Sequence, residues 1–351
     1  MRDLDNPDTY QELDPTGMRE RLATFAEQCE SAWKQVSGLH LPHEYSHADK
    51  VVLLGMGGSA IGGDLLAGLA SYEEAVPILV SRDYNIPSYV DDHTLVIACS
   101  YSGNTAETLS GFRQAVDLGA NVVAVTSGGR LAAEARERGV PAFIFSYQGE
   151  PRCALGYTFL SAVGILQEVG LLQDKSADVS QTVERLRELA GEWGHAVPSG
   201  ENPAKELAQD LVGKAVVVYG SGAFGAVARR WKTQLNENAK TWAFWDVLPE
   251  AHHNSVVGYG LPQEMARIAA AVLIYPQGMH PQLERRYDLT CRLLDEQGIP
   301  SYVVDVQGPS PLCQMLTGTY FGDWVSYYLA MAQGIDPSPI PPIDFIKSQL
   351  G

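Results

Sequence analysis

Hydroxyl side chains gather where the apolar run TLVIA meets the stretch CSYSGNTAETL, and a further hydroxyl, Ser59, lies in the glycine-rich segment GMGGSA. Hydroxyls and backbone N–H groups at the positive end of a helix form a cradle for phosphate. An alternative is that Ser102 and Thr105 only cap the helix that follows, as Ser and Thr commonly do. Several hydroxyls around Gly103 favour a phosphate site over a simple cap. The candidate phosphate-binding residues are Gly57, Gly58, Ser59, Ser100, Ser102 and Thr105.

A second candidate cluster lies in NENAKTWAFWDVLPEAHHNSVVG, which brings carboxylates and imidazoles close together in sequence. Such groups can bind a metal ion or move protons. His252 and His253 are adjacent and would point apart, which disfavours a shared metal, so we expect proton transfer and no metal. For Glu237 the alternative is a solvated helix carboxylate, and for either histidine an ordinary surface or packed residue.

Arg152, in EPRCALGY, is a further candidate, because a fixed guanidinium stabilises a developing oxyanion. The alternative is that it pairs with an acidic side chain. Three more histidines occur in HLPHEYSH, which contains a proline and precedes the first apolar run. We interpret that segment as a polar loop.

These residues must be positioned by alternating elements. From residue 50, short β-branched runs such as VVLLG and TLVIACS alternate with amphipathic runs, which indicates βαβ crossovers and a parallel sheet. Two helical patterns then follow without a strand, and the alternation resumes at KAVVVYGSG after the loop GHAVPSGENP. We therefore expect an α/β fold with two doubly wound parallel-sheet domains. The expected division is an N-terminal helical arm (1–45), a first domain (46–155), a helical connector (156–203), a second domain (204–310) and C-terminal helices (311–351).

The two expected domains begin alike, with VVLLGMGGSAIGG and VVVYGSGAFG, which suggests an internal repeat. Both segments also fit the dinucleotide fingerprint G-x-G-x-x-G/A. That fingerprint needs an acidic residue at the end of the next strand, where this chain has Ser81 and Arg82 ahead of Asp83. An NAD-dependent oxidoreductase is therefore a weak hypothesis, and we expect no cofactor. For the second copy, glycines that merely permit a tight turn explain the pattern equally well.

Composition restricts the partners. The chain has 42 acidic and 25 basic residues and a net charge of -17, which repels nucleic acid and anionic membranes. The five cysteines are scattered without C-x-x-C spacing, which is typical of a reduced compartment. The N-terminus is acidic, unlike a signal peptide, and no apolar run is long enough to cross a bilayer. We expect a cytoplasmic protein with no nucleic-acid or membrane partner.

The segments GMGGSAIGGD, SYSGNTAET, PRCALGY, NENAK, HHNSVVG and the C-terminal PIPPIDFIKSQL together resemble the bifunctional phosphoglucose/phosphomannose isomerase family. That family is built from two sugar isomerase (SIS) domains, which are flavodoxin-like, and the resemblance spans nearly the whole chain. It implies metal-independent interconversion of glucose 6-phosphate, and of mannose 6-phosphate, with fructose 6-phosphate through a cis-enediol.

The resemblance also implies roles for single residues. Glu237 would be the base, and His253 would open the sugar ring, entering the site from the partner subunit of a homodimer. Lys347 would assist at the ring, and Arg152 would stabilise the negatively charged intermediate. The serines and Thr105 would hold the phosphate.

One position departs from the family pattern, in which a glutamate usually follows the HN pair; here it is Ser255. His252 is also unusual, and an exchange of roles between the two histidines stays open. The competing function is a non-catalytic SIS-domain regulator that binds a sugar phosphate. A regulator would need an effector domain, and the sequence contains neither a basic helix-turn-helix pattern nor a glutaminase-like N-terminal cysteine.

Overall fold

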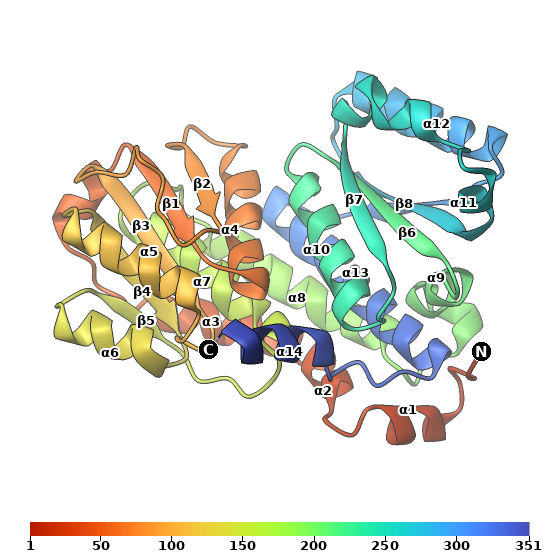
Figure 1. The fold of residues 1–351 in the computed structure, drawn as a ribbon, viewed down its shortest axis with the longest axis horizontal. Coiled ribbons are helices and arrows are strands. Elements are labelled where there is room, and N and C mark those ends of the chain that lie inside the picture. The colour runs from red at the N-terminus through yellow and green to blue at the C-terminus, as the bar shows by residue number, and fades with distance from the viewer. Residues whose placement is uncertain (351) are drawn as a thin grey trace. The chain divides into compact units, whose positions relative to one another are not determined.

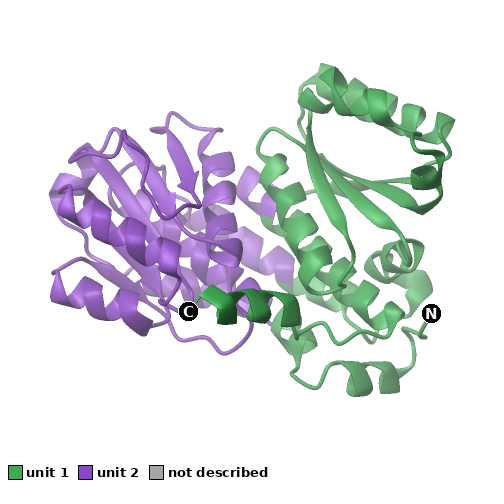
Figure 2. Cartoon of the chain, in the orientation of Figure 1, with its two compact units in different colours: residues 1–23, 187–307, 316–351 green, residues 24–186, 308–315 purple. Residues whose placement is uncertain are grey.

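The structure, a computed structural model, describes residues 1–350 and contains two parallel β-sheets with helices packed around them (Figure 1). The chain divides into two compact units (Figure 2). Unit 1 comprises residues 1–23, 187–307 and 316–351, and unit 2 comprises residues 24–186 and 308–315. Two helices, α8 (Ser176–Trp193) and α13 (Pro311–Gln333), have residues in both units.

Unit 2 holds a five-stranded sheet in the order β2-β1-β3-β4-β5, with every neighbouring pair parallel. The strands are β1 (Lys50–Leu54), β2 (Ile78–Ser81), β3 (Thr94–Ser100), β4 (Asn121–Thr126) and β5 (Ala142–Ile144). The helices are α3 (Phe25–Val36), α4 (Gly57–Ala70), α5 (Ala106–Asp117), α6 (Gly129–Glu137) and α7 (Leu155–Glu168). Every residue of β3 is buried, as expected for a central strand covered by helices on both faces.

Unit 1 holds a four-stranded parallel sheet in the order β7-β6-β8-β9. The strands are β6 (Ala215–Ser221), β7 (Ala243–Leu248), β8 (Ala269–Pro276) and β9 (Ser301–Val306). The helices are α1 (Pro7–Leu13), α2 (Met18–Ala23), α9 (Pro203–Asp210), α10 (Phe224–Glu237), α11 (Gln263–Ile268), α12 (Pro281–Glu296) and α14 (Pro341–Leu350). The core lies between the sheet and its helices, where Tyr219, Leu273 and Tyr287 are nearly fully buried.

The predicted fold class is confirmed, because each unit is a doubly wound parallel sheet. The two sheets share one order: β1 and β6 lie between the next strand along the chain and the strand after it, as in flavodoxin-like folds. The turns that follow β1 and β6 also match, with Gly57 at φ 49° and Gly222 at φ 51°. These matching turns support the internal repeat. The finer division into arm, connector and tail stays a prediction.

Strand β7 was not among the strands expected from the sequence. Its segment AFWDVL exposes Phe244 and Trp245, because β7 is the edge strand of its sheet and only its ends are buried. An edge strand lacks the continuous apolar run that marks a central parallel strand.

Within residues 1–350, no helix is long and apolar enough to cross a bilayer.

Candidate active site

The hydroxyl-rich segments meet at the carboxyl ends of β1 and β3, the neighbouring strands where the strand order of unit 2 reverses. Ligands of doubly wound sheets bind at this switch point. The backbone N–H of Tyr101, after β3, donates a hydrogen bond to Ser59 Oγ, after β1, at 3.2 Å. The two segments that we expect to hold phosphate therefore lie side by side.

The loop after β3 is ordered by its own hydroxyls. Ser100 Oγ and Thr105 Oγ1 are 2.9 Å apart, and Ser102 Oγ accepts a hydrogen bond from the backbone N–H of Asn104 at 3.2 Å. Thr105 occupies the N-cap position of α5, yet its side chain makes no capping hydrogen bond. The capping alternative therefore does not describe Thr105. Helix α5 begins at the end of this loop and α4 begins at the neighbouring turn after β1, and the dipoles of both helices favour an anion near their N-termini.

Gly103 permits the tight form of this loop. Its φ is +66°, and a Cβ atom at this position would overlap the carbonyl oxygen of Gly128. Gly128 follows β4, where Thr126 Oγ1 donates to the Gly128 carbonyl at 2.9 Å. The hydroxyl loop is thus packed against the end of the next strand, which leaves it little freedom to rearrange.

Arg152 lies beside the same switch point, in a short 3-10 helix, η2 (Pro151–Cys153). It is only 2 % exposed. A Cβ atom on Gly58 would stand 3.1 Å from the Cα atom of Arg152, so the first turn of α4 and η2 are in direct backbone contact. Unit 2 thus brings together Arg152, the glycine turn and the hydroxyl loop.

Two residues that the sequence reasoning missed support this arrangement. The hydroxyl of Tyr101 donates to the carbonyls of Tyr147 and Gly149, at 2.8 and 3.1 Å, and so ties the hydroxyl loop to the segment before Arg152. The amide of Gln28 donates to the Cys153 carbonyl and accepts from the Gly156 N–H, at 2.9 and 2.7 Å. These partners lie 46 to 128 residues apart in the chain, so no local pattern could indicate them.

Cys99, beside the hydroxyls, is not a nucleophile. Burial raises the pKa of its thiol to about 12, although a hydrogen bond with Ser59 offsets part of that rise. The thiol is therefore protonated at neutral pH and packs as a small apolar side chain.

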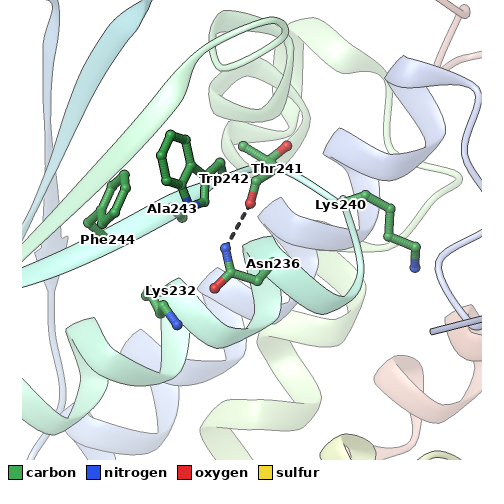
Figure 3. Close-up of a pocket in the computed structure, with 7 residues that line it drawn as sticks. All are labelled: Lys232, Asn236, Lys240, Thr241, Trp242, Ala243 and Phe244. Atoms are coloured by element: carbon green, nitrogen blue, oxygen red, sulfur yellow. Dashed lines mark hydrogen bonds between the residues drawn. The ribbon is translucent and has the colours of Figure 1, made fainter. Parts of the chain in front are cut away.

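Glu237 is the last residue of α10, in unit 1. The residues after it are held firmly: Asn238 donates to Ser326 Oγ at 2.9 Å, and Gln333 donates to the Ala239 carbonyl at 2.9 Å. A pocket of about 460 Å³ lies on this side of the unit, where Asn236 donates to the Thr241 carbonyl at 2.9 Å (Figure 3). It is lined by Lys232, Asn236, Lys240, Thr241, Trp242, Ala243 and Phe244. Because Glu237 does not line this pocket, we do not assign the pocket to substrate binding.

His253 follows β7 in a 3-10 turn, η4 (Glu250–His253), and its side chain is exposed. The neighbouring His252 is half-buried and contacts Arg286 and Thr290 of α12. Ser255, which replaces the usual glutamate, donates to Asp246 Oδ2 on β7. Lys347 lies on α14, also exposed.

Glu237 and His253 lie at opposite ends of β7 within unit 1. Helix α10 runs back across the sheet and ends where β7 begins, whereas His253 follows the other end of that strand. The six residues of β7 span about 20 Å.

Among residues 1–350, no group of three or more His, Cys, Asp or Glu side chains is placed to hold a metal ion.

At the switch point of unit 1, the hydroxyl that ends β6 is held by neighbouring side chains. Ser221 is 3 % exposed. Its hydroxyl contacts Met279 Sδ at 3.4 Å and accepts a hydrogen bond from Tyr287 at 3.1 Å. These contacts agree with the simpler interpretation of the second repeat, in which its glycines permit a tight turn.

The fold defines a protein built from two SIS-type units, and unit 2 contains the candidate phosphate-binding residues. Residues 200–350 match the family described as bacterial phospho-glucose isomerase C-terminal SIS domain. A hypothetical protein from Thermus thermophilus has the same fold, with a TM-score of 0.74, 18% identity and coverage of 98% of this chain and 92% of its own.

Two curated relatives, each similar over more than nine tenths of the chain, show that the chain belongs to the bifunctional phosphoglucose/phosphomannose isomerase family. The bifunctional phosphoglucose/phosphomannose isomerase of Caldicellulosiruptor bescii is 37% identical over 336 residues, which cover 95% of this chain and 98% of the relative. The enzyme of the same name from Aquifex aeolicus is 32% identical, with coverage of 92% and 98%. The resemblance stated from the sequence motifs is therefore confirmed.

Proposed function

We propose that this protein interconverts glucose 6-phosphate and mannose 6-phosphate with fructose 6-phosphate, without a metal or another cofactor. The observation that carries the proposal is the paired hydroxyl and glycine turn at the switch point of unit 2, in a chain of this family. The N-termini of α4 and α5, with Ser59, Ser100, Ser102 and Thr105, offer donors to a phosphate dianion. The net charge of -17 makes such a local site necessary for an anionic substrate.

The reaction moves one proton between carbons and one between oxygens. In the aldose-to-ketose direction the Glu237 carboxylate takes the C2 proton, and the electron pair shifts to the carbonyl oxygen to form an enediolate. The guanidinium of Arg152 stabilises that negative charge. The O2 proton passes to O1 and Glu237 returns its proton to C1, which completes the ketose. Because the enediol has no stereocentre at C2, glucose and mannose 6-phosphates share one intermediate.

Ring opening precedes the proton transfer, and we assign it to His253 with assistance from Lys347. A proton donor to the ring oxygen and an acceptor for the anomeric hydroxyl are needed. An exposed imidazole can exchange its proton with solvent between turnovers. The two residues supply the titratable groups for this step.

His253 serves the site of the partner subunit in a homodimer. The separation of about 20 Å between the ends of β7 is longer than a hexose phosphate, so Glu237 and His253 of one chain cannot act on one substrate. Trp242 is 73% exposed, and the edge strand β7 carries the exposed Phe244 and Trp245. Exposed aromatic side chains on an unpaired sheet edge favour a subunit contact.

The cytoplasm is the compartment that we assign. In the part of the chain that the structure describes, no disulfide bond joins any of the five cysteines, Cys29, Cys99, Cys153, Cys291 and Cys313, which is typical of a reducing environment. The alternative hypothesis, a non-catalytic regulator, predicts sugar-phosphate binding without turnover.

The NAD-dependent hypothesis is weakened further by Arg82, which pairs with Asp64 beside the position that would need a free acidic group.

The direct test is fructose 6-phosphate formation from each aldose phosphate in the presence of a metal chelator. We expect turnover of both substrates at rates that the chelator does not change. Binding of both substrates without turnover would favour the regulator instead. Loss of turnover with chelator, restored by added metal, would contradict the metal-independent mechanism.

Mixing two inactive variants tests the shared histidine. Glu237→Gln and His253→Ala chains, mixed and allowed to exchange subunits, form mixed dimers in which one site holds an intact Glu237 and an intact partner histidine. Random exchange then restores about a quarter of the wild-type activity. If both residues act in the same chain, the mixture stays as inactive as the separate variants. The matched control is His253→Ala mixed with itself.

A further inference from the structure

His252 and His253 have opposite surroundings although they are neighbours. His253 is exposed, whereas His252 is half-buried between its own turn and α12. His252 Nε2 lies 2.8 Å from Thr290 Oγ1, and its Nδ1 lies 3.0 Å from Arg286 Nη1. Both ring nitrogens of His252 therefore contact side chains of the same helix, α12.

The hydrogen bonds define the tautomer of His252. Thr290 donates its hydroxyl proton to the Arg286 carbonyl at 2.7 Å, so its oxygen can only accept from the imidazole. Nε2 must then carry a hydrogen. A guanidinium can only donate, so Nδ1 must be the bare nitrogen that accepts from Arg286. Each contact is satisfied only when His252 is neutral and protonated at Nε2.

The charges around His252 agree with this state. Burial, the Arg286 guanidinium and the neighbouring His253 all lower the pKa of His252. A pocket of about 440 Å³ lies against the same side chain. Its other charged groups are Arg292 and Glu296 of α12, which pair with each other at 3.3 Å. The cation nearest to the imidazole is therefore Arg286.

The far side of the His253 turn is also anchored. Asn254 donates to Glu250 Oε1 at 2.8 Å, and Ser255 donates to Asp246 on β7. Only the His253 side chain between these anchors lacks a hydrogen bond to the rest of unit 1 among those the structure describes. The backbone on both sides of His253 is therefore held in place, while the exposed His253 side chain stays accessible to a substrate.

We propose that His252 is a positioning residue, a neutral imidazole that ties the His253 turn to α12 through Arg286 and Thr290. The proposal rests on the proposed function and assigns ring opening to His253 alone, because the proton of His252 is committed to Thr290. It also explains how the turn keeps its shape with Ser255 in place of a glutamate: the anchors are His252 toward α12 and Ser255 toward β7.

The test uses two matched pairs, Arg286→Met with Arg285→Met and Thr290→Val with Thr290→Ser, in the full-length protein. Arg285 is an exposed neighbour on α12, and serine keeps the hydroxyl that Thr290→Val removes. We expect Arg286→Met and Thr290→Val to lower kcat about tenfold, as misplacement of a reacting group does, with KM unchanged. Arg285→Met and Thr290→Ser should behave like the wild type.

Nitrogen NMR of histidine-labelled protein gives a readout independent of activity. The wild type and the two controls should show one imidazole, that of His252, fixed as the neutral Nε2–H tautomer. That fixed signal should be lost in Arg286→Met and Thr290→Val. Loss of the tautomer signal with unchanged kcat would overturn the positioning role, and a change in KM alone would mean that Arg286 contacts substrate instead. A wild type without turnover would contradict the proposed function, whereas an active wild type with equally active variants contradicts only this inference.

Discussion

Replacing Glu237 by glutamine lowers kcat for glucose and mannose 6-phosphates by about 10²- to 10⁴-fold, the contribution of a positioned general base. The amide has nearly the shape of the carboxylate but cannot accept the C2 proton. The phosphate cradle that we propose lies in unit 2, away from the substitution in unit 1, so KM should stay within a few-fold. Steady-state kinetics in both reaction directions measure the effect.

Glu206→Gln is the matched control, because it removes one negative charge from an exposed helix position of the same unit. We expect it to leave kcat and KM unchanged. Exchange of the substrate C2 proton with solvent deuterium should also stop in Glu237→Gln. If that exchange continues at the wild-type rate, another group is the base.

Arg152→Lys is expected to lower kcat by about 10²- to 10³-fold, as the loss of a group aimed at a developing oxyanion does. Lysine keeps the charge, but an ammonium is a compact point charge without the planar fork of a guanidinium. The position is 2 % exposed and packed against Gly58, so the shorter reach of lysine cannot be corrected by movement of η2.

A planar, negatively charged mimic of the enediolate separates this role from ordinary substrate binding. Its affinity should fall in parallel with kcat in Arg152→Lys, while the affinity for inorganic phosphate stays constant. Arg113→Lys serves as control, because Arg113 pairs with Glu134 between two helices of the same unit at 2.6 Å. Equal loss of phosphate affinity would instead place Arg152 in the phosphate site.

The sequence was sufficient to predict the parts of the site that are local in the chain. The strand-to-helix turns at Ser59 and Thr105 carry their own signature, because a strand, a glycine and several hydroxyls occur within a few positions. Parallel pairing of β1 with β3 then brings the two turns together. Fold class followed in the same way from the alternation of apolar runs.

The parts that the sequence could not indicate depend on contacts between distant segments. Gln28 contacts the segment after Arg152 across more than a hundred residues, and Tyr101 contacts the segment before Arg152 across nearly fifty. Strand β7 was missed because its aromatics face outward at a sheet edge. The state of His252 needed the positions of Arg286 and Thr290, without which the two histidines look equivalent.

Of the two repeats, we expect only the one in unit 2 to bind a phosphate. Because Met279 and Tyr287 contact the Ser221 hydroxyl, we expect a calorimetric titration to give a stoichiometry of one phosphoester per chain, although the chain contains two similar domains. A domain that does not bind the phosphate can accept substitutions at its strand ends without loss of substrate affinity. Duplication of one ancestral domain can therefore produce one domain that binds the phosphate and another that carries reacting residues.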